Sequence, residues 1–257
     1  MLFKDIIKSN NIELHNQKYK KEITMYNRDY LSNQSTQYTQ ESSQAQLMSF
    51  LKATYQLFAG SLLAATAGAY IGLGIVSILM GPVKWVLFAV ELALIFFVIP
   101  RVKHTPGVNL AVLFAFTFIT GLTIAPLLTA IFAMPSGAAI VGQAFLMTSV
   151  AFGGISMFAM TTKRDFSSIG KFLFIALIIM IVAGISNIFI QSSMMQLAIA
   201  SGGALLFSAF ILYDTQQIIK GNYDSPIEAA LSLYLDFFNL FISLLQILGI
   251  MNSGDKE

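Results

Sequence analysis

Seven apolar runs constrain this chain more than any other feature, because each is close to the about 17–25 residues that cross a bilayer as a helix. Lipid offers no hydrogen-bond partners, so each run must satisfy its own backbone groups as an α-helix. The sequence therefore predicts an all-α polytopic membrane protein, a bundle of seven transmembrane helices. The expected spans are 52–79, 83–100, 108–133, 137–161, 171–190, 195–219 and 228–250.

Composition narrows the function classes. Of the 257 residues, 56% are hydrophobic and only 11% are charged, against about 25% charged in a soluble domain. The net charge of +2 gives no reason to expect nucleic acid as a partner. There is no cysteine, which excludes disulfides, thiol catalysis and Cys-ligated zinc. Without a phosphate-binding loop or a dinucleotide fingerprint, we expect no cofactor and no enzymatic activity.

The polar ends of the chain are predicted to lie outside the bundle. Residues 1–49 are rich in Asn, Gln, Ser, Tyr and Lys, which predicts a flexible tail and not a secretory signal peptide. Translation from Met25 is an alternative start, suggested by the change in composition there. The expected domains are this tail, a transmembrane domain over 50–252 and a short C-terminal tail over 253–257.

Basic residues predict the orientation. With the N-terminus in the cytoplasm and the C-terminus outside, the outer ends of the spans carry only Lys84 and Lys256, which satisfies the positive-inside rule. The inner ends then carry Lys52, Arg101, Lys103, Lys163, Arg164, Lys171 and Lys220.

Three acidic residues lie well inside predicted spans: Glu91, Asp214 and Asp236. A charged side chain costs roughly 2.5–3.5 kcal/mol at a helix centre, so such residues indicate function. At about 1.5 Å per residue, both aspartates lie roughly 9–15 Å from the cytoplasmic end. Because a short turn joins their helices, we expect antiparallel neighbours whose carboxyl groups meet. Glu91 lies at a similar depth, either as part of this site or as a packing residue.

The last span supports this site, because Ser232, Asp236, Asn239 and Ser243 fall on one face of it. Lipid cannot satisfy such a stripe, which predicts that this helix is central. Two close carboxyl groups tend to share a proton and titrate as a pair. Protonated, the pair would hold the two helices together; deprotonated, it would attract a hard cation such as Ca²⁺. The sequence thus predicts a pH-sensitive cation gate, with Asp214 and Asp236 as sensor and Ca²⁺ ligands.

Other residues near the acids receive weaker interpretations. Tyr213 is interpreted as a supporting or packing residue beside Asp214. Arg101 is first a topology marker, and a second interpretation pairs it with Asp214 as a latch.

Small residues recur at every fourth position in two spans. Ala64, Gly68 and Gly72 do so in the first, and Ser149 and Gly153 in the fourth. This spacing lets helices approach closely, so we expect helix contacts at both places.

The segments around the two aspartates, ILYDTQQII (211–219) and ALSLYLDFFNLFISLLQIL (230–248), resemble the paired-aspartate motifs of the Bax inhibitor-1 family, including its bacterial YetJ-type and YccA-type members. Glu91, GLTIAP (121–126) and AGISNIF (183–189) are also similar. The resemblance covers roughly residues 50–252.

The resemblance implies a fold and a function. It implies seven helices with the last one central, a di-aspartyl pH sensor at Asp214 and Asp236, and a Ca²⁺ leak across a bacterial inner membrane. It implies lipid, Ca²⁺ and protons as partners and a basic latch on the second helix, for which Arg101 is the nearest match. Some relatives carry a basic residue late in the last helix, where this chain has Gln246.

Two other functions stay open at this point. The YccA-type branch is similar to proteins that modulate a membrane-bound AAA protease, so a regulator of proteolysis or stress response acting through protein partners and the tail 1–49 is an alternative. Tyr213-Asp214 also resembles half of an intramembrane aspartyl protease site, but the second aspartate lies in Leu233-Tyr234-Leu235-Asp236 and not in the GxGD motif that such a site requires.

Overall fold

The computed structural model describes residues 20–21 and 44–254, and the chain divides into two compact units, Met1–Ser49 and Phe50–Glu257. The predicted flexibility of most of the tail and the alternative start at Met25 lie outside the described residues. So do residues 255–257 of the predicted C-terminal tail.

The described part of the chain contains seven helices that are long and apolar enough to cross a membrane, and no strand. The predicted all-α, seven-helix architecture is therefore confirmed. The helices are Gln44–Gly74, a second span built from α3 (Val83–Ala93), η1 (Leu94–Val98) and α4 (Ile99–Val102), then α5 (Val108–Phe132), α6 (Gly137–Thr161), η2 (Ser167–Ile169) with α7 (Gly170–Ile190), α8 (Ser193–Ile219) and α9 (Pro226–Gly254).

The first span differs from its predicted limits. It begins at Gln44 and ends at Gly74, and a short helix α2 (Val76–Leu79) follows. Gln, Ala, Leu and Met after position 43 are good helix formers, so the helix continues into the segment expected to be tail. Near its end, two glycines weaken the helix, and the Ile75 N–H bonds to the Gly72 carbonyl at 3.1 Å in a tight turn.

The second span is interrupted by a turn of π-helix, Leu94–Val98, where the Ile99 N–H bonds to the carbonyl of Leu94. A π-turn holds one more residue than an α-turn, so the residues after it are rotated by about 100° from where a regular helix would place them. This rotation decides which basic residue near the end of the span faces α9.

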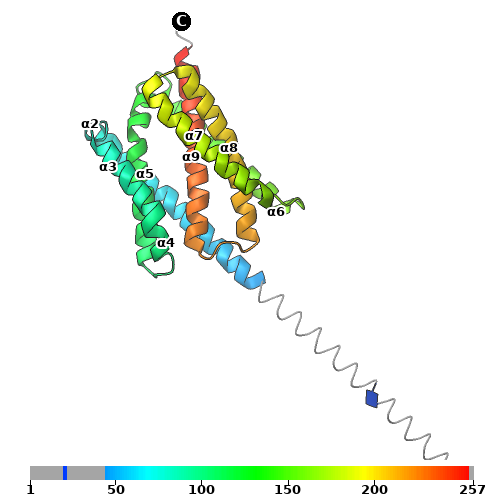
Figure 1. Ribbon diagram of the computed structural model, residues 1–257. Coiled ribbons are helices and arrows are strands. Elements are labelled where there is room, and N and C mark those ends of the chain that lie inside the picture. The colour runs from blue at the N-terminus through cyan, green and yellow to red at the C-terminus, as the bar shows by residue number, and fades with distance from the viewer. Residues whose placement is uncertain (1–19, 22–43, 255–257) are drawn as a thin grey trace, which may run out of the picture. The chain divides into compact units, whose positions relative to one another are not determined.

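Helix α9 runs through the middle of the bundle (Figure 1). Leu233 and Tyr234 have no exposed surface. On another part of α9, the ring of Phe237 packs edge-on against Phe58 of the first helix and Phe152 of α6, with centroids 5.8 and 5.6 Å apart. The predicted central position of the last helix is confirmed.

The first helix and α5 cross in backbone contact. A Cβ atom added to Gly68 would lie 2.0 Å from the carbonyl oxygen of Phe118, and one added to Gly121 would lie 2.0 Å from the carbonyl oxygen of Ala65. The small-residue stripe of the first span is therefore a packing motif, as predicted. The prediction for the fourth span is wrong, because an added Cβ at Gly153 would meet open space.

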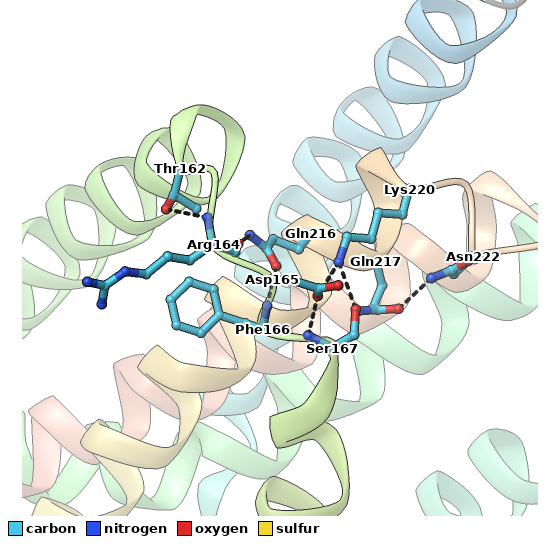
Figure 2. A network of polar contacts seen from close by, with 9 residues as sticks. All are labelled: Thr162, Arg164, Asp165, Phe166, Ser167, Gln216, Gln217, Lys220 and Asn222. Carbon is cyan, nitrogen blue, oxygen red and sulfur yellow. Dashed lines mark hydrogen bonds and ion pairs between the residues drawn. The ribbon is translucent and has the colours of Figure 1, made fainter.

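The loop between α6 and α7 is bound to the end of α8 by a polar network (Figure 2). The Gln216 side chain accepts from the Phe166 N–H at 2.9 Å and donates to the Arg164 carbonyl at 2.8 Å. Lys220 donates to the Asp165 carboxylate and, at 2.8 Å, to the Ser167 hydroxyl. These bonds hold in place the last turns of the helix that carries Asp214.

We expect Asp165→Asn to lower the melting temperature in detergent by roughly 1–2 °C, because exposed ion pairs contribute little. The hydrogen bond from Lys220, and then those from Ser167, hold the pKa of Asp165 well below its usual range. The stabilisation is therefore present above the ordinary aspartate pKa of about 3.9 and is lost as the pH falls through the lower folded value. Thermal melts over a pH series measure this.

Arg164→Gln is the matched control, because the Arg164 backbone carbonyl, and not its side chain, accepts the bond from Gln216. A melting temperature equally lowered in both variants, or a deficit in Asp165→Asn that persists in strong acid, would contradict the assignment.

Candidate functional site

The carboxyl groups of Asp214 on α8 and Asp236 on α9 meet inside the bundle. Both residues are buried, with 6% and 5% of their surface exposed, and their side chains interact directly. The short turn after α8 makes α8 and α9 antiparallel neighbours. The structure thus brings together two of the three acids that the sequence singled out, Asp214 and Asp236.

The partners of the two carboxyl groups are unequal. The Ser232 hydroxyl, one turn before Asp236 on α9, donates to Oδ2 of Asp214. Oδ2 of Asp236 is buried and has no hydrogen-bond partner among the described residues. A buried polar atom without a partner is costly, so this oxygen is the polar atom of the pair that remains open to a further hydrogen bond or ligand.

A pocket of about 480 Å³ that is open on one side, here called the central cavity, lies among α7, α8 and α9. Both aspartates line it, and aliphatic, thioether and aromatic side chains of α7 and α8 form its other walls. The whole predicted polar stripe of α9 faces it, extended by one further residue: Ser232, Asp236, Asn239, Ser243 and Gln246.

A second hollow of about 330 Å³, the Lys103 hollow, lies at the end of the bundle where α4 approaches α9. Lys103 forms ion pairs there with Asp224 at 3.2 Å and Glu228 at 3.0 Å. The hydrogen bonds to Glu228 and then Asp224 raise the pKa of Lys103. Ser232 and Leu235 line both this hollow and the central cavity, so they form the wall between the two.

Tyr223 completes this wall. It lines the Lys103 hollow, and its hydroxyl donates to the Ser232 hydroxyl at 2.9 Å. Burial, and next the charge of Asp214, raise the pKa of Tyr223, so its hydroxyl stays protonated. A hydrogen-bonded chain therefore runs from Tyr223 through Ser232 to Asp214. Tyr223 lies in a turn between two spans, where no sequence pattern marks it.

A third hollow of about 310 Å³, the Gln196 hollow, lies near Ile250 at the other end of α9. The side-chain amide of Asn187 donates to the side-chain carbonyl oxygen of Gln196 at 2.8 Å. The side-chain amide of Gln196 donates to the side-chain carbonyl oxygen of Gln246 at 2.9 Å. This amide chain separates the hollow from the central cavity. The only sequence signal was the presence of amide residues near the ends of three spans.

Glu91 and Tyr213 lie outside the central cavity. The Glu91 carboxylate accepts from the Thr123 hydroxyl of α5 at 2.9 Å and is not among the residues lining the cavity. Tyr213 packs with its hydroxyl against Gly170 at the start of α7. Tyr213 therefore packs beside the site, and Glu91 links the second span to α5.

Arg101 does not form the latch offered as its second interpretation. Its guanidinium donates to the Phe97 carbonyl of its own helix and lies over the Phe97 ring, and no ion pair joins it to Asp214 in the described structure. The π-turn before Arg101 rotates the register of the span, and Lys103, directly after the span, is the basic residue that pairs with acids near α9.

Within residues 20–21 and 44–254, no group of three or more His, Asp or Glu side chains is placed to hold a metal ion. Two carboxyl groups, with the Ser232 and Asn239 side chains lining the same cavity, present the kind of oxygen atoms that hard cations prefer as ligands.

The fold and the site define a class: a polytopic α-helical membrane protein with two interacting carboxyl groups at a pocket between its helices. A family model described as "Inhibitor of apoptosis-promoting Bax1" matches residues 47–253. The chain belongs to the Bax inhibitor-1 family and is an integral membrane protein.

Several proteins in other organisms are similar to this chain. An uncharacterized protein of Campylobacter jejuni is 50% identical, over 90% of this chain and 100% of its own length. An uncharacterized membrane protein of Vibrio cholerae is 42% identical, over 80% of this chain and 91% of its own. Protein lifeguard 4 of Mus musculus is 38% identical, over 66% of this chain and 70% of its own.

Proposed function

We propose that this protein is a pH-sensitive leak channel for Ca²⁺ or a related cation, gated by Asp214 and Asp236. One observation carries the proposal: two buried carboxyl groups interact at the side of the central cavity, with one oxygen of Asp236 unpartnered among the described residues. A carboxylate within a membrane is costly and is kept chiefly for function.

The gating follows from the chemistry of two carboxyl groups in contact. With one shared proton, a hydrogen bond joins α8 to α9 and holds the bundle closed. Without that proton, two negative charges face each other at high electrostatic cost, unless the helices separate or a cation enters. A hard cation with a preference for oxygen ligands, such as Ca²⁺, suits this position.

A route for the cation follows α9. The Lys103 hollow, the central cavity and the Gln196 hollow succeed one another along this helix and share lining residues or hydrogen-bonded neighbours. The Tyr223–Ser232 pair closes one barrier and the Gln246–Gln196 pair closes the other. We assign the Lys103 end to the cytoplasm of a bacterial inner membrane, because basic residues gather at that end.

Ca²⁺ uptake into proteoliposomes, from mildly acidic to mildly alkaline pH, tests the proposal. We expect wild-type uptake to vary with pH and Asp214→Asn/Asp236→Asn to lose that dependence, because amides do not titrate in this range. Glu91→Gln is the matched control: it removes a carboxyl group that does not line the cavity and should leave the pH dependence unchanged.

Two outcomes would contradict the proposal. One is uptake no greater than that of protein-free liposomes at every pH. The other is a pH dependence that survives unchanged in the double variant, which would place the sensor elsewhere.

A further inference from the structure

The two barriers of the central cavity differ in chemistry. Toward the Lys103 hollow the barrier contains two hydroxyl groups, those of Tyr223 and Ser232. Toward the Gln196 hollow it contains the primary amides of Gln246 and Gln196. A hydroxyl both donates and accepts through one oxygen, so it can pass a proton on. A primary amide donates through nitrogen and accepts through oxygen, so a chain of amides does not.

The hydroxyl chain also has a direction and an end point. Tyr223 donates to Ser232, and Ser232 donates to the Asp214 carboxylate. The chain begins in the Lys103 hollow and ends on the aspartate pair. In the described structure the amide chain ends on Gln246, and no hydrogen bond joins it to either aspartate.

We propose that Tyr223 and Ser232 form the path by which protons from the Lys103 side of the membrane reach the aspartate pair. Ser232 gives its proton to Asp214, Tyr223 gives its proton to Ser232, and a hydronium ion in the Lys103 hollow gives one to Tyr223. Each hydroxyl loses and gains one proton, Asp214 gains one, and water is left in the hollow. Tyr223 and Ser232 thus act on the proposed gate through Asp214, as positioning residues for its proton.

The charges around the path favour proton entry from this side. Lys103, Asp224 and Glu228 line the hollow, and their sum is one negative charge, which raises the local proton concentration. Asp236 of α9 faces Asp214. Helix α6 contains no titratable residue, and α7 contains only Lys171, which is exposed in its first turn. The remaining ionisable groups of α8 and α9 point elsewhere, because Tyr213 packs against Gly170, Lys220 pairs with Asp165 and Tyr234 bonds to Thr120.

The rate of protonation tests this inference. In nanodiscs, the carbonyl stretch of a protonated carboxyl group is followed by time-resolved infrared spectroscopy after a step to acid, and the band is assigned by its loss in Asp214→Asn or Asp236→Asn. We expect the band to appear roughly tenfold more slowly in Tyr223→Phe, because a hydrogen-bonded step is missing. Ser232→Ala should slow it as well.

Tyr234→Phe is the matched control. It also removes a buried tyrosine hydroxyl from the α8–α9 region, but that hydroxyl bonds to Thr120 of α5 and does not line the central cavity. We expect a wild-type rate. An unchanged rate in Tyr223→Phe, or equal slowing in both variants, would overturn the path.

The side of entry is tested with proteoliposomes of a single orientation. Acid added on the Lys103 side should protonate the pair faster than acid added on the Gln196 side, and equal rates would overturn the inference.

The inference rests on one part of the proposed function, namely that the aspartate pair gains and loses a proton. The infrared signal reports protonation and does not depend on ion flux. An absence of Ca²⁺ uptake would therefore refute the proposed channel without contradicting the proton path.

Discussion

Gly121→Ala should lower the free energy of unfolding by about 2–3 kcal/mol, although alanine is the better helix former. The added methyl would lie 2.0 Å from the carbonyl oxygen of Ala65 and 2.9 Å from the backbone nitrogen of Ala69. Backbone atoms cannot rotate away, so the first helix and α5 must separate. Chemical unfolding in mixed micelles, followed by circular dichroism, measures the change.

Gly154→Ala is the control with the opposite expected sign. Gly154 lies in the middle of α6 and is exposed, with nothing within 4 Å of an added Cβ. There the methyl should stabilise the helix by roughly 0.5–1 kcal/mol. If both variants shifted in the same direction, the close crossing of the first helix and α5 would be refuted.

Lys103→Met should raise Ca²⁺ flux by a factor on the order of ten at low ionic strength. Removal of the ammonium leaves Asp224 and Glu228 unpaired and makes the Lys103 hollow more negative by one charge. Cations should then concentrate at this entrance. Initial rates of Ca²⁺ uptake into proteoliposomes measure the effect, and the gain should shrink in high salt because the charges are screened.

The pH dependence of this gain has a definite sign. Because its two acid partners raise the pKa of Lys103, the ammonium persists across the neutral range and is lost only as the pH rises through the raised pKa. The ratio of the flux in the variant to the flux in wild type should therefore be constant near neutrality and approach one only in strong alkali.

Lys84→Met is the matched control, since Lys84 lies over the Trp85 ring and lines none of the three hollows. A salt-independent gain in Lys103→Met, or an equal gain in the control, would contradict an electrostatic role for the hollow.

The fold class and the two aspartates followed from the sequence alone. Apolar length fixes the number of spans, because lipid permits only helices there. Asp214 and Asp236 stood out because a carboxyl group in a span is costly, and the polar stripe of α9 placed that helix inside the bundle for the same reason. Both arguments depend on how well lipid accommodates a chemical group. The apolar composition of each run already shows that its surroundings are lipid.

Tertiary structure decided which residues meet between helices. A single π-turn turned Arg101 toward its own helix and left Lys103 to pair with Asp224 and Glu228. Only the folded turn after α8 places Tyr223 over Ser232. Such contacts depend on register and on rotation about each helix axis, and a shift of one residue changes a side chain's direction by about 100°. Hydropathy does not carry that information, so only the packed helices fix it.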